Sequence, residues 1–386
     1  MNDLISSRLR HRVRTLSTIL GETMTRQHGQ TFLSKVEEIR LLAKANRQSV
    51  TDPDNSVKGD HEQLRQVLNK LDDESLISVA RAFNQFLNLT NIAEQAESTE
   101  TVIGSQLEEL FTRLISKGID EQRVLETITS MRCDLVLTAH PTEITRRTLI
   151  QKYNRIASAL NDVNEDKELD TQERLDLERL IAEVWFTDEI RTERPTPQDE
   201  AKWGYAVIEH SLWSAIPRLW NRLSELTLKV TGETLPLSVA PIKISSWMGG
   251  DRDGNPNVTA DVTKEILRLA RWMAADLYLR DVEELLSQLS MSNCSSELAA
   301  ECPQGVDEPY RHILRSLRER LAATRTWAET SEPPEPGLIH SDADLIAPLQ
   351  LCYDSLLLCG MDIIADGLLK EPLIRANTFG VTLVEL

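Results

Sequence analysis

Residues 136–149 read VLTAHPTEITRRTL, an apolar run that changes abruptly into helix-forming residues. The stretch from Cys133 to Ala139 is short, apolar and partly β-branched, which predicts a buried strand. Pro141 fits the first turn of a helix, because its missing N–H would have no partner there. Glu143 adds the acidic character that a helix N-terminus favours. The segment therefore predicts a strand-to-helix junction, with His140 at the turn.

The surroundings predicted for His140 favour chemistry on an anionic substrate. Backbone N–H groups at a helix start attract negative charge, and Arg146 and Arg147 follow within about two helical turns. An imidazole titrates near neutral pH, so it can move a proton on an anionic substrate. The alternative is a histidine that caps a strand in a structural loop. This segment alone leaves both interpretations open.

Residues 242–259, IKISSWMGGDRDGNPNVT, show a second strand that runs into a polar loop. Glycines let backbone amides approach an anion closely, and successive N–H groups can form a concave binding nest. A calcium-binding loop would begin with the same acidic spacing. It is excluded here because its turn glycine would fall on Pro256 and its glutamate on Val262. A plain tight turn remains the alternative.

The strings AHPTE (139–143) and WMGGDRDGNP (247–256), in this order, resemble the phosphoenolpyruvate carboxylase family, most closely its bacterial form. Two further stretches fit the same family: ARAFNQFLNLTNIAEQ (80–95) and TDEIRTERPTPQDEAKWG (187–204). The resemblance extends over the whole chain. It implies that phosphoenolpyruvate and bicarbonate are joined to give oxaloacetate and phosphate, with Mg²⁺ as cofactor, which supplies the tricarboxylic acid cycle. In the family the reaction runs through carboxyphosphate and an enolate that attacks carbon dioxide.

The resemblance also suggests roles for individual residues. His140 matches the catalytic histidine, which would take a proton from the carboxyl group of the intermediate and hold carbon dioxide near the enolate. Independently of the resemblance, a protein of negative net charge needs a locally basic pocket for anionic substrates, and Arg146, Arg147 and Arg252 are candidates for it. Only one of the first two need face the pocket. Trp247 would exclude water from carboxyphosphate. The structural alternatives are a salt bridge for the arginines and core packing for the tryptophan.

Asp251 and Asp253 are assigned to loop structure and not to a metal, because the family places its Mg²⁺ ligands in a later part of the chain. Residues 379–386, FGVTLVEL, resemble the start of a barrel strand of that family. The arginine motif, metal-binding carboxylates, lysine loop and glycine-rich phosphate loop that follow in the family are absent here. We therefore expect the N-terminal portion of a longer enzyme, inactive by itself. The alternative is a truncated, non-catalytic helical fragment or scaffold.

Charge and cysteine content narrow the range of partners. The 386 residues carry 43 Lys and Arg against 61 Asp and Glu, a formal charge of −18. Such a surface repels nucleic acid and anionic membranes, so neither is expected as a partner. The five cysteines are odd in number and lack zinc-type spacing, which is typical of reduced cytosolic thiols. No apolar signal core follows the N-terminal arginines, and a cytoplasmic protein is expected.

Helical periodicity dominates the chain and predicts a mainly α fold. Strand-like runs stand out only at 133–139, 242–247 and 379–386. We therefore predict an N-terminal helical region (1–130) and the first part of a helix-elaborated (β/α) barrel (131–386). Three strands cannot close a barrel, so exposed apolar faces and strand edges are expected. Allosteric control and a homotetramer are implied by the resemblance for a complete enzyme.

Overall fold

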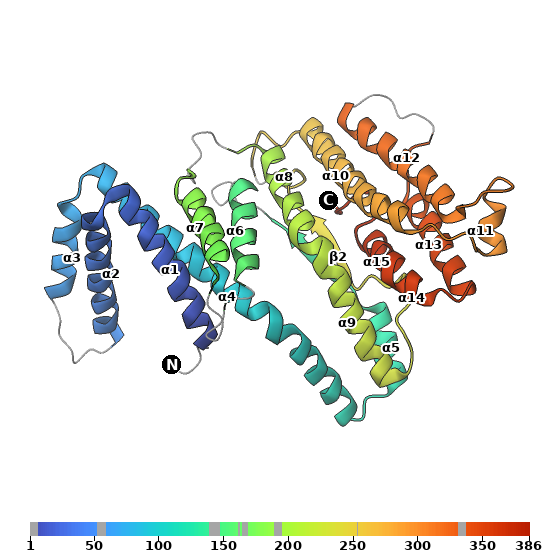
Figure 1. Cartoon of the computed structure of the whole chain (residues 1–386), viewed down its shortest axis with the longest axis horizontal. Coiled ribbons are helices and arrows are strands. Elements are labelled where there is room, and N and C mark those ends of the chain that lie inside the picture. Colours follow the sequence, from blue (N-terminus) through green and yellow to red (C-terminus); the bar gives the residue numbers. More distant parts are fainter. Residues whose placement is uncertain are drawn as a thin grey trace. The chain divides into compact units, whose positions relative to one another are not determined.

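A computed structural model describes the chain in eight segments: residues 7–51, 59–138, 147–160, 163, 169–188, 195–252, 254–330 and 337–386. Helices form nearly all of its regular structure (Figure 1), which confirms the predicted mainly α class. The chain divides into two compact units, Met1–Ser105 with Thr145–Arg191, and Gln106–Ile144 with Thr192–Leu386. Both units are discontinuous in sequence, whereas the predicted domain boundary is a single cut after residue 130. The domain assignment stays a prediction.

All the regular structure described in the first unit is helical. Its helices are α1 (Ser7–His28), α2 (Gln30–Thr51), α3 (Gly59–Asn69), the larger part of α4 (Asp73–Ser116), α6 (Arg147–Ala159) and α7 (Thr171–Trp185). The spacing of Leu177, Ile181 and Val184 predicts one apolar helix face, and all three side chains are buried in α7. They pack with Leu16 and Ile19 of α1. This apolar face therefore holds α7 against its neighbours.

The second unit contains the remaining elements. These are α5 (Glu121–Ser130), β1 (Cys133–Leu137), α8 (Pro197–Val207), the π-helical turn η1 (Ile208–Leu212), α9 (Trp213–Thr231), β2 (Ile242–Ser246), α10 (Ala260–Gln288), α11 (Ser296–Ala300), α12 (Pro309–Thr330), α13 (Asp342–Leu358), α14 (Asp362–Ile364), the π-helical turn η2 (Ala365–Leu369) and α15 (Lys370–Phe379). Helices α10 and α12 pack along each other (Figure 1).

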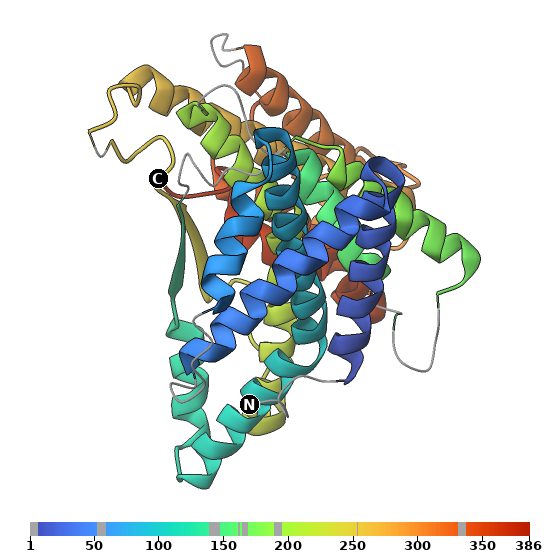
Figure 2. The same ribbon diagram turned by 90° about the vertical axis from the view of Figure 1, so that its left-hand side faces the viewer.

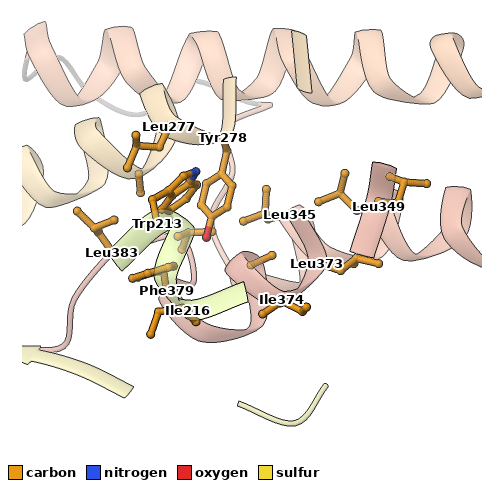
Figure 3. Close-up of a cluster of buried hydrophobic side chains, with 14 of the residues drawn as sticks. Trp213, Ile216, Leu277, Tyr278, Leu345, Leu349, Leu373, Ile374, Phe379 and Leu383 are labelled. Atoms are coloured by element: carbon orange, nitrogen blue, oxygen red, sulfur yellow. The ribbon is translucent and has the colours of Figure 1, made fainter. Parts of the chain in front are cut away.

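An aromatic cluster lies at the centre of this unit (Figure 3). The Trp213 ring lies 5.0 Å from Tyr278, edge-on, and 5.0 Å from Phe379, stacked. Pro217 lies one turn into α9, and its missing N–H leaves the carbonyl of Trp213 without its usual helical donor. The Nε of Arg375 donates to that carbonyl at 2.8 Å. The proline thus creates an acceptor that links α9 to α15.

Strands β1 and β2 pair in parallel (Figure 2), with register running from Cys133 opposite Ile242 to Leu137 opposite Ser246. Strands were predicted at both places, and both are confirmed. The predicted burial of the first strand is wrong, since Leu135 is 39% and Val136 43% exposed. The described residues form a sheet of only two strands, so β1 has one neighbour and little covers its side chains.

The predicted strand at 379–386 is also wrong. Helix α15 continues to Phe379, and the residues after it form turns and bends that end in one isolated parallel bridge between Ser245 and Glu385. The backbone explains this result, because Gly380 (φ 57°) and Leu383 (φ 65°) leave the extended region. The carboxylate of Asp342 also accepts a hydrogen bond from the N–H of Val381 at 2.8 Å, which holds the turn.

Candidate functional site

The candidate site begins where the two strands end. The main-chain N–H of Trp247 donates to the carbonyl of Leu137 at 3.1 Å, one step beyond the last strand pair. The chain after β1 and the loop after β2 therefore leave the same end of the sheet. Functional side chains commonly collect at this end of parallel strands.

A tight turn follows β2 immediately. The N–H groups of Gly250 and Asp251 both donate to the carbonyl of Trp247, at 3.0 and 2.9 Å. The N–H of Met248 donates to the hydroxyl of Ser246 at 3.1 Å. Further along, the hydroxyl of Thr259 accepts from the N–H of Val262 at 3.3 Å and caps α10. The turn and the helix start are thus both closed by local hydrogen bonds.

Two glycines let this loop lie close to neighbouring helices. Gly249 has φ 79°, and a Cβ there would lie 2.2 Å from Cδ1 of Ile266 in α10. A Cβ on Gly204 in α8 would lie 2.1 Å from Cε of Met248, whose side chain is 3% exposed. Met248 therefore fills a notch in α8 while Gly249 lies against α10. The role in anion binding predicted for these glycines stays a prediction.

Helices α8 and α10 are joined beneath the loop by a buried tyrosine. The hydroxyl of Tyr205 donates to the carbonyl of Ile266 at 3.4 Å. Burial raises the pKa of the Tyr205 phenol well above its usual value, so the group stays protonated and remains a donor. This contact connects the two helices on which the loop rests.

The side chains predicted to act in this loop are accessible. Trp247 is 58% exposed, so the core-packing alternative for this tryptophan is wrong in the described chain. Arg252 and Asp251 are exposed as well. The loop after β2 thus exposes an aromatic residue and a cationic residue at the end of the parallel strands, two groups suited to an anionic ligand.

The side chains of four residues singled out in the sequence lie outside the described residues. His140 and Arg146 lie outside the described residues, as does Asp253. Arg147 is the first residue of α6, but its side chain lies outside the described part. The structure brings together the Trp247 loop and the end of β1.

The described residues do not fit a magnesium site. Across the described segments, no group of three or more His, Cys, Asp or Glu side chains is placed to hold a metal ion. Asp251, at the start of the rejected calcium-loop pattern, is exposed beside Arg252. No metal-dependent step is therefore assigned to these residues. All five cysteines are free thiols. Among the described helices, none combines the length and apolar character needed to cross a membrane.

Sequence reasoning missed the residues that support the loop, namely Gly204, Ile266 and Thr263. The hydroxyl of Thr263 donates to the carbonyl of Gly249 at 2.6 Å. Only Gly204 carried a usable signal, because a glycine inside a helical run is unfavourable and indicates close approach of another segment. A threonine and an isoleucine in the first turns of a helix carry no such signal.

Comparison with known proteins agrees with the motifs. The family model described as phosphoenolpyruvate carboxylase matches residues 9–386. A phosphoenolpyruvate carboxylase of Pseudomonas fluorescens (strain Pf0-1) is 50% identical over 398 aligned residues, which cover 99% of this chain and 44% of the relative. Those of Pseudomonas entomophila and Hahella chejuensis are 49% and 48% identical, each again with 44% of the relative covered. The chain thus spans less than half the length of the curated relatives it matches. The chain belongs to the phosphoenolpyruvate carboxylase family.

Proposed function

We propose that this chain supplies the N-terminal portion of a phosphoenolpyruvate carboxylase, a lyase that forms oxaloacetate and phosphate from phosphoenolpyruvate and bicarbonate. The observation that carries the proposal is the family match over residues 9–386. The hydrogen bond between Trp247 and Leu137 adds support, because it draws the loop of the second family string to the strand that precedes the first. The product would replenish the tricarboxylic acid cycle.

His140 would act as the proton-transfer group of this reaction. It follows Leu137 by three residues, and the carbonyl of Leu137 accepts a hydrogen bond from Trp247. A neutral imidazole can take the proton of a carboxyl group near pH 7, whereas an unperturbed lysine or arginine cannot. When His140 takes the carboxyl proton of carboxyphosphate, the bond between the carboxyl carbon and the phosphate oxygen would break, phosphate would leave, and carbon dioxide would form beside the enolate carbon.

The loop residues would prepare the substrate for that step. The exposed indole of Trp247 would exclude water from carboxyphosphate, whose hydrolysis competes with transfer. Arg252, with Arg146 or Arg147, would bind phosphate or carboxylate oxygens through their planar guanidinium groups. These contacts orient the anions and leave the chemical step to His140.

The remaining properties follow from the family. Mg²⁺ is proposed as the cofactor of the complete enzyme because the family implies it, and the described residues of this chain contain no ligand cluster for it. A cytoplasmic homotetramer under allosteric control is proposed for the complete enzyme, with no nucleic acid or membrane as partner. An incomplete barrel that begins with β1 and β2 is proposed for the fold, supported by their parallel pairing.

The test is a His140→Asn substitution in a protein of full family length that carries this segment. Oxaloacetate formation, followed with a coupled assay, should fall by about a hundredfold or more, the usual effect of losing a general acid or base. His340→Asn is the matched control, because His340 is exposed and only its main-chain N–H bonds to Asp344. Separate measurement of phosphate release shows whether carboxyphosphate still forms. Oxaloacetate production near the unmodified rate in the His140 variant would refute the proposed role.

A further inference from the structure

Thr263, in the first turns of α10, makes a hydrogen bond that reaches outside its helix. Its hydroxyl lies 2.6 Å from the carbonyl of Gly249 and 3.1 Å from the carbonyl of Thr259. A hydroxyl has one proton to donate, and the shorter contact is the better one. The main hydrogen bond of Thr263 therefore goes to the loop that carries Trp247.

This contact is unusual among the helical threonines of the chain. A threonine inside a helix ordinarily donates to the carbonyl four residues earlier. Thr326 in α12 does so at 3.0 Å, and within the described residues its hydroxyl makes no other hydrogen bond. The partner of Thr263 is instead fourteen residues earlier, across the loop. Thr326 is thus a natural control for the ordinary contact.

The Gly249 peptide is held on several sides. Its α carbon faces Ile266, with room for no side chain, and the neighbouring Met248 is buried against Gly204. The carbonyl of Gly249 then accepts the proton of Thr263. Sterics restrict where this peptide lies, and the hydrogen bond fixes which way its carbonyl points. That direction determines the turn that begins at Trp247.

We propose that Thr263 is a positioning residue, which orients the exposed indole of Trp247 by holding the carbonyl of Gly249. The turn between them closes on the carbonyl of Trp247 through the N–H groups of Gly250 and Asp251. Rotation of the peptide group that carries the Gly249 carbonyl would disrupt these hydrogen bonds. The indole of Trp247 would then no longer be held in one orientation. The catalytic consequence rests on the proposed function, whereas the structural one does not.

The structural consequence is tested by hydrogen–deuterium exchange in a protein of full family length that carries this segment. Thr263→Val keeps the side-chain shape and removes the donor. Exchange of the amides of Gly250 and Asp251 should become about tenfold faster, since a hydrogen bond that restricts local opening is lost. Thr263→Ser keeps the hydroxyl and should restore slow exchange, while Thr326→Val should leave this loop unchanged. Unchanged exchange in Thr263→Val would overturn the proposal.

The catalytic consequence is tested by a double-mutant cycle. Thr263→Val should lower kcat/KM for bicarbonate about three- to tenfold, with no comparable change in Thr263→Ser. If Thr263 acts through Trp247, adding Thr263→Val to Trp247→Tyr should cause little further loss. Fully multiplicative losses would overturn positioning through Trp247. A full-length protein that forms no oxaloacetate at all would refute the proposed function, and the exchange experiment would still decide whether Thr263 holds the loop.

Discussion

The main-chain N–H of Trp247 donates to the carbonyl of Leu137 at 3.1 Å, although the two residues lie far apart in the sequence. This hydrogen bond extends the parallel register of β1 and β2 by one residue. The two family strings therefore start from one end of one small sheet. The position of the Trp247 indole depends on strand pairing and on the loop that follows.

Trp247→Tyr should impair catalysis in a full-length protein with little loss of stability. Trp247 is 58% exposed, so its replacement removes little buried surface, whereas a smaller ring would shield carboxyphosphate less well. We expect a several-fold higher KM for bicarbonate, measured by titration, and a nearly unchanged melting temperature. Trp220→Tyr is the control: Trp220 is 2% exposed and donates to the carbonyl of Val239, so it should lose stability instead. A large melting shift with unchanged kinetics for Trp247→Tyr would contradict the prediction.

Gly249→Ala should destabilise the fold more than Gly254→Ala. Both glycines have positive φ, 79° and 75°, so alanine is strained at either position. A Cβ at position 249 would also lie 3.2 Å from Cβ of Ile266 and closer to its Cδ1, while position 254 has nothing within 4 Å. We expect a cost of about 1 kcal/mol at 254 and about 1–3 kcal/mol more at 249. Chemical denaturation measures both, and equal losses would show that contact with Ile266 does not matter.

Asp281→Ala should be destabilising because the buried guanidinium of Arg375 loses its buried charge partner and keeps the ion pair with Glu371, whose side chain is 47% exposed. The Asp281 carboxylate accepts two 3.0 Å hydrogen bonds from Nη1 of Arg375, and both side chains are 13% exposed. Burial raises the pKa of Asp281, against the opposing effect of Arg375. Removing one partner of such a pair typically costs about 3–5 kcal/mol.

Asp261→Ala provides the comparison, since Asp261 is 94% exposed and lies 3.8 Å from Lys264. Its loss should be about 1 kcal/mol or less in urea denaturation. Similar losses for the two variants would contradict a buried pair.

The 386-residue chain alone should associate in solution and show no magnesium-dependent carboxylation of phosphoenolpyruvate. Leu135 and Val136 of β1 and the side chain of Trp247 are exposed apolar groups, and β1 pairs with one strand within the described residues, which favours self-association. Light scattering measures the mass, and a coupled oxaloacetate assay measures activity. Val136→Lys should reduce association, because charge on an edge strand opposes pairing. A monodisperse monomer with carboxylase activity would refute the expectation that this site is incomplete.

Local patterns in the sequence were sufficient for some elements and for the family. The apolar runs at 133–137 and 242–246 form strands, and the spacing from Leu177 to Trp185 forms a buried helix face, because these signals depend on neighbours in the chain. The two family strings indicated the family that the comparisons show. The role of His140 stays a prediction, since this residue lies outside the described part.

Tertiary structure alone decided the rest. Residues 379–386 alternate like a strand, yet Phe379 ends a helix and a carboxylate from Asp342 holds the following turn. No local sequence pattern indicates a hydrogen-bond partner that lies this far away in the chain. The same holds for Thr263. Its hydroxyl makes its shorter hydrogen bond to the Gly249 carbonyl and not to the carbonyl of Thr259, the partner that a helical threonine ordinarily has. Propensity describes how a residue interacts with its chain neighbours, whereas these two outcomes depend on groups that only folding brings within hydrogen-bond distance.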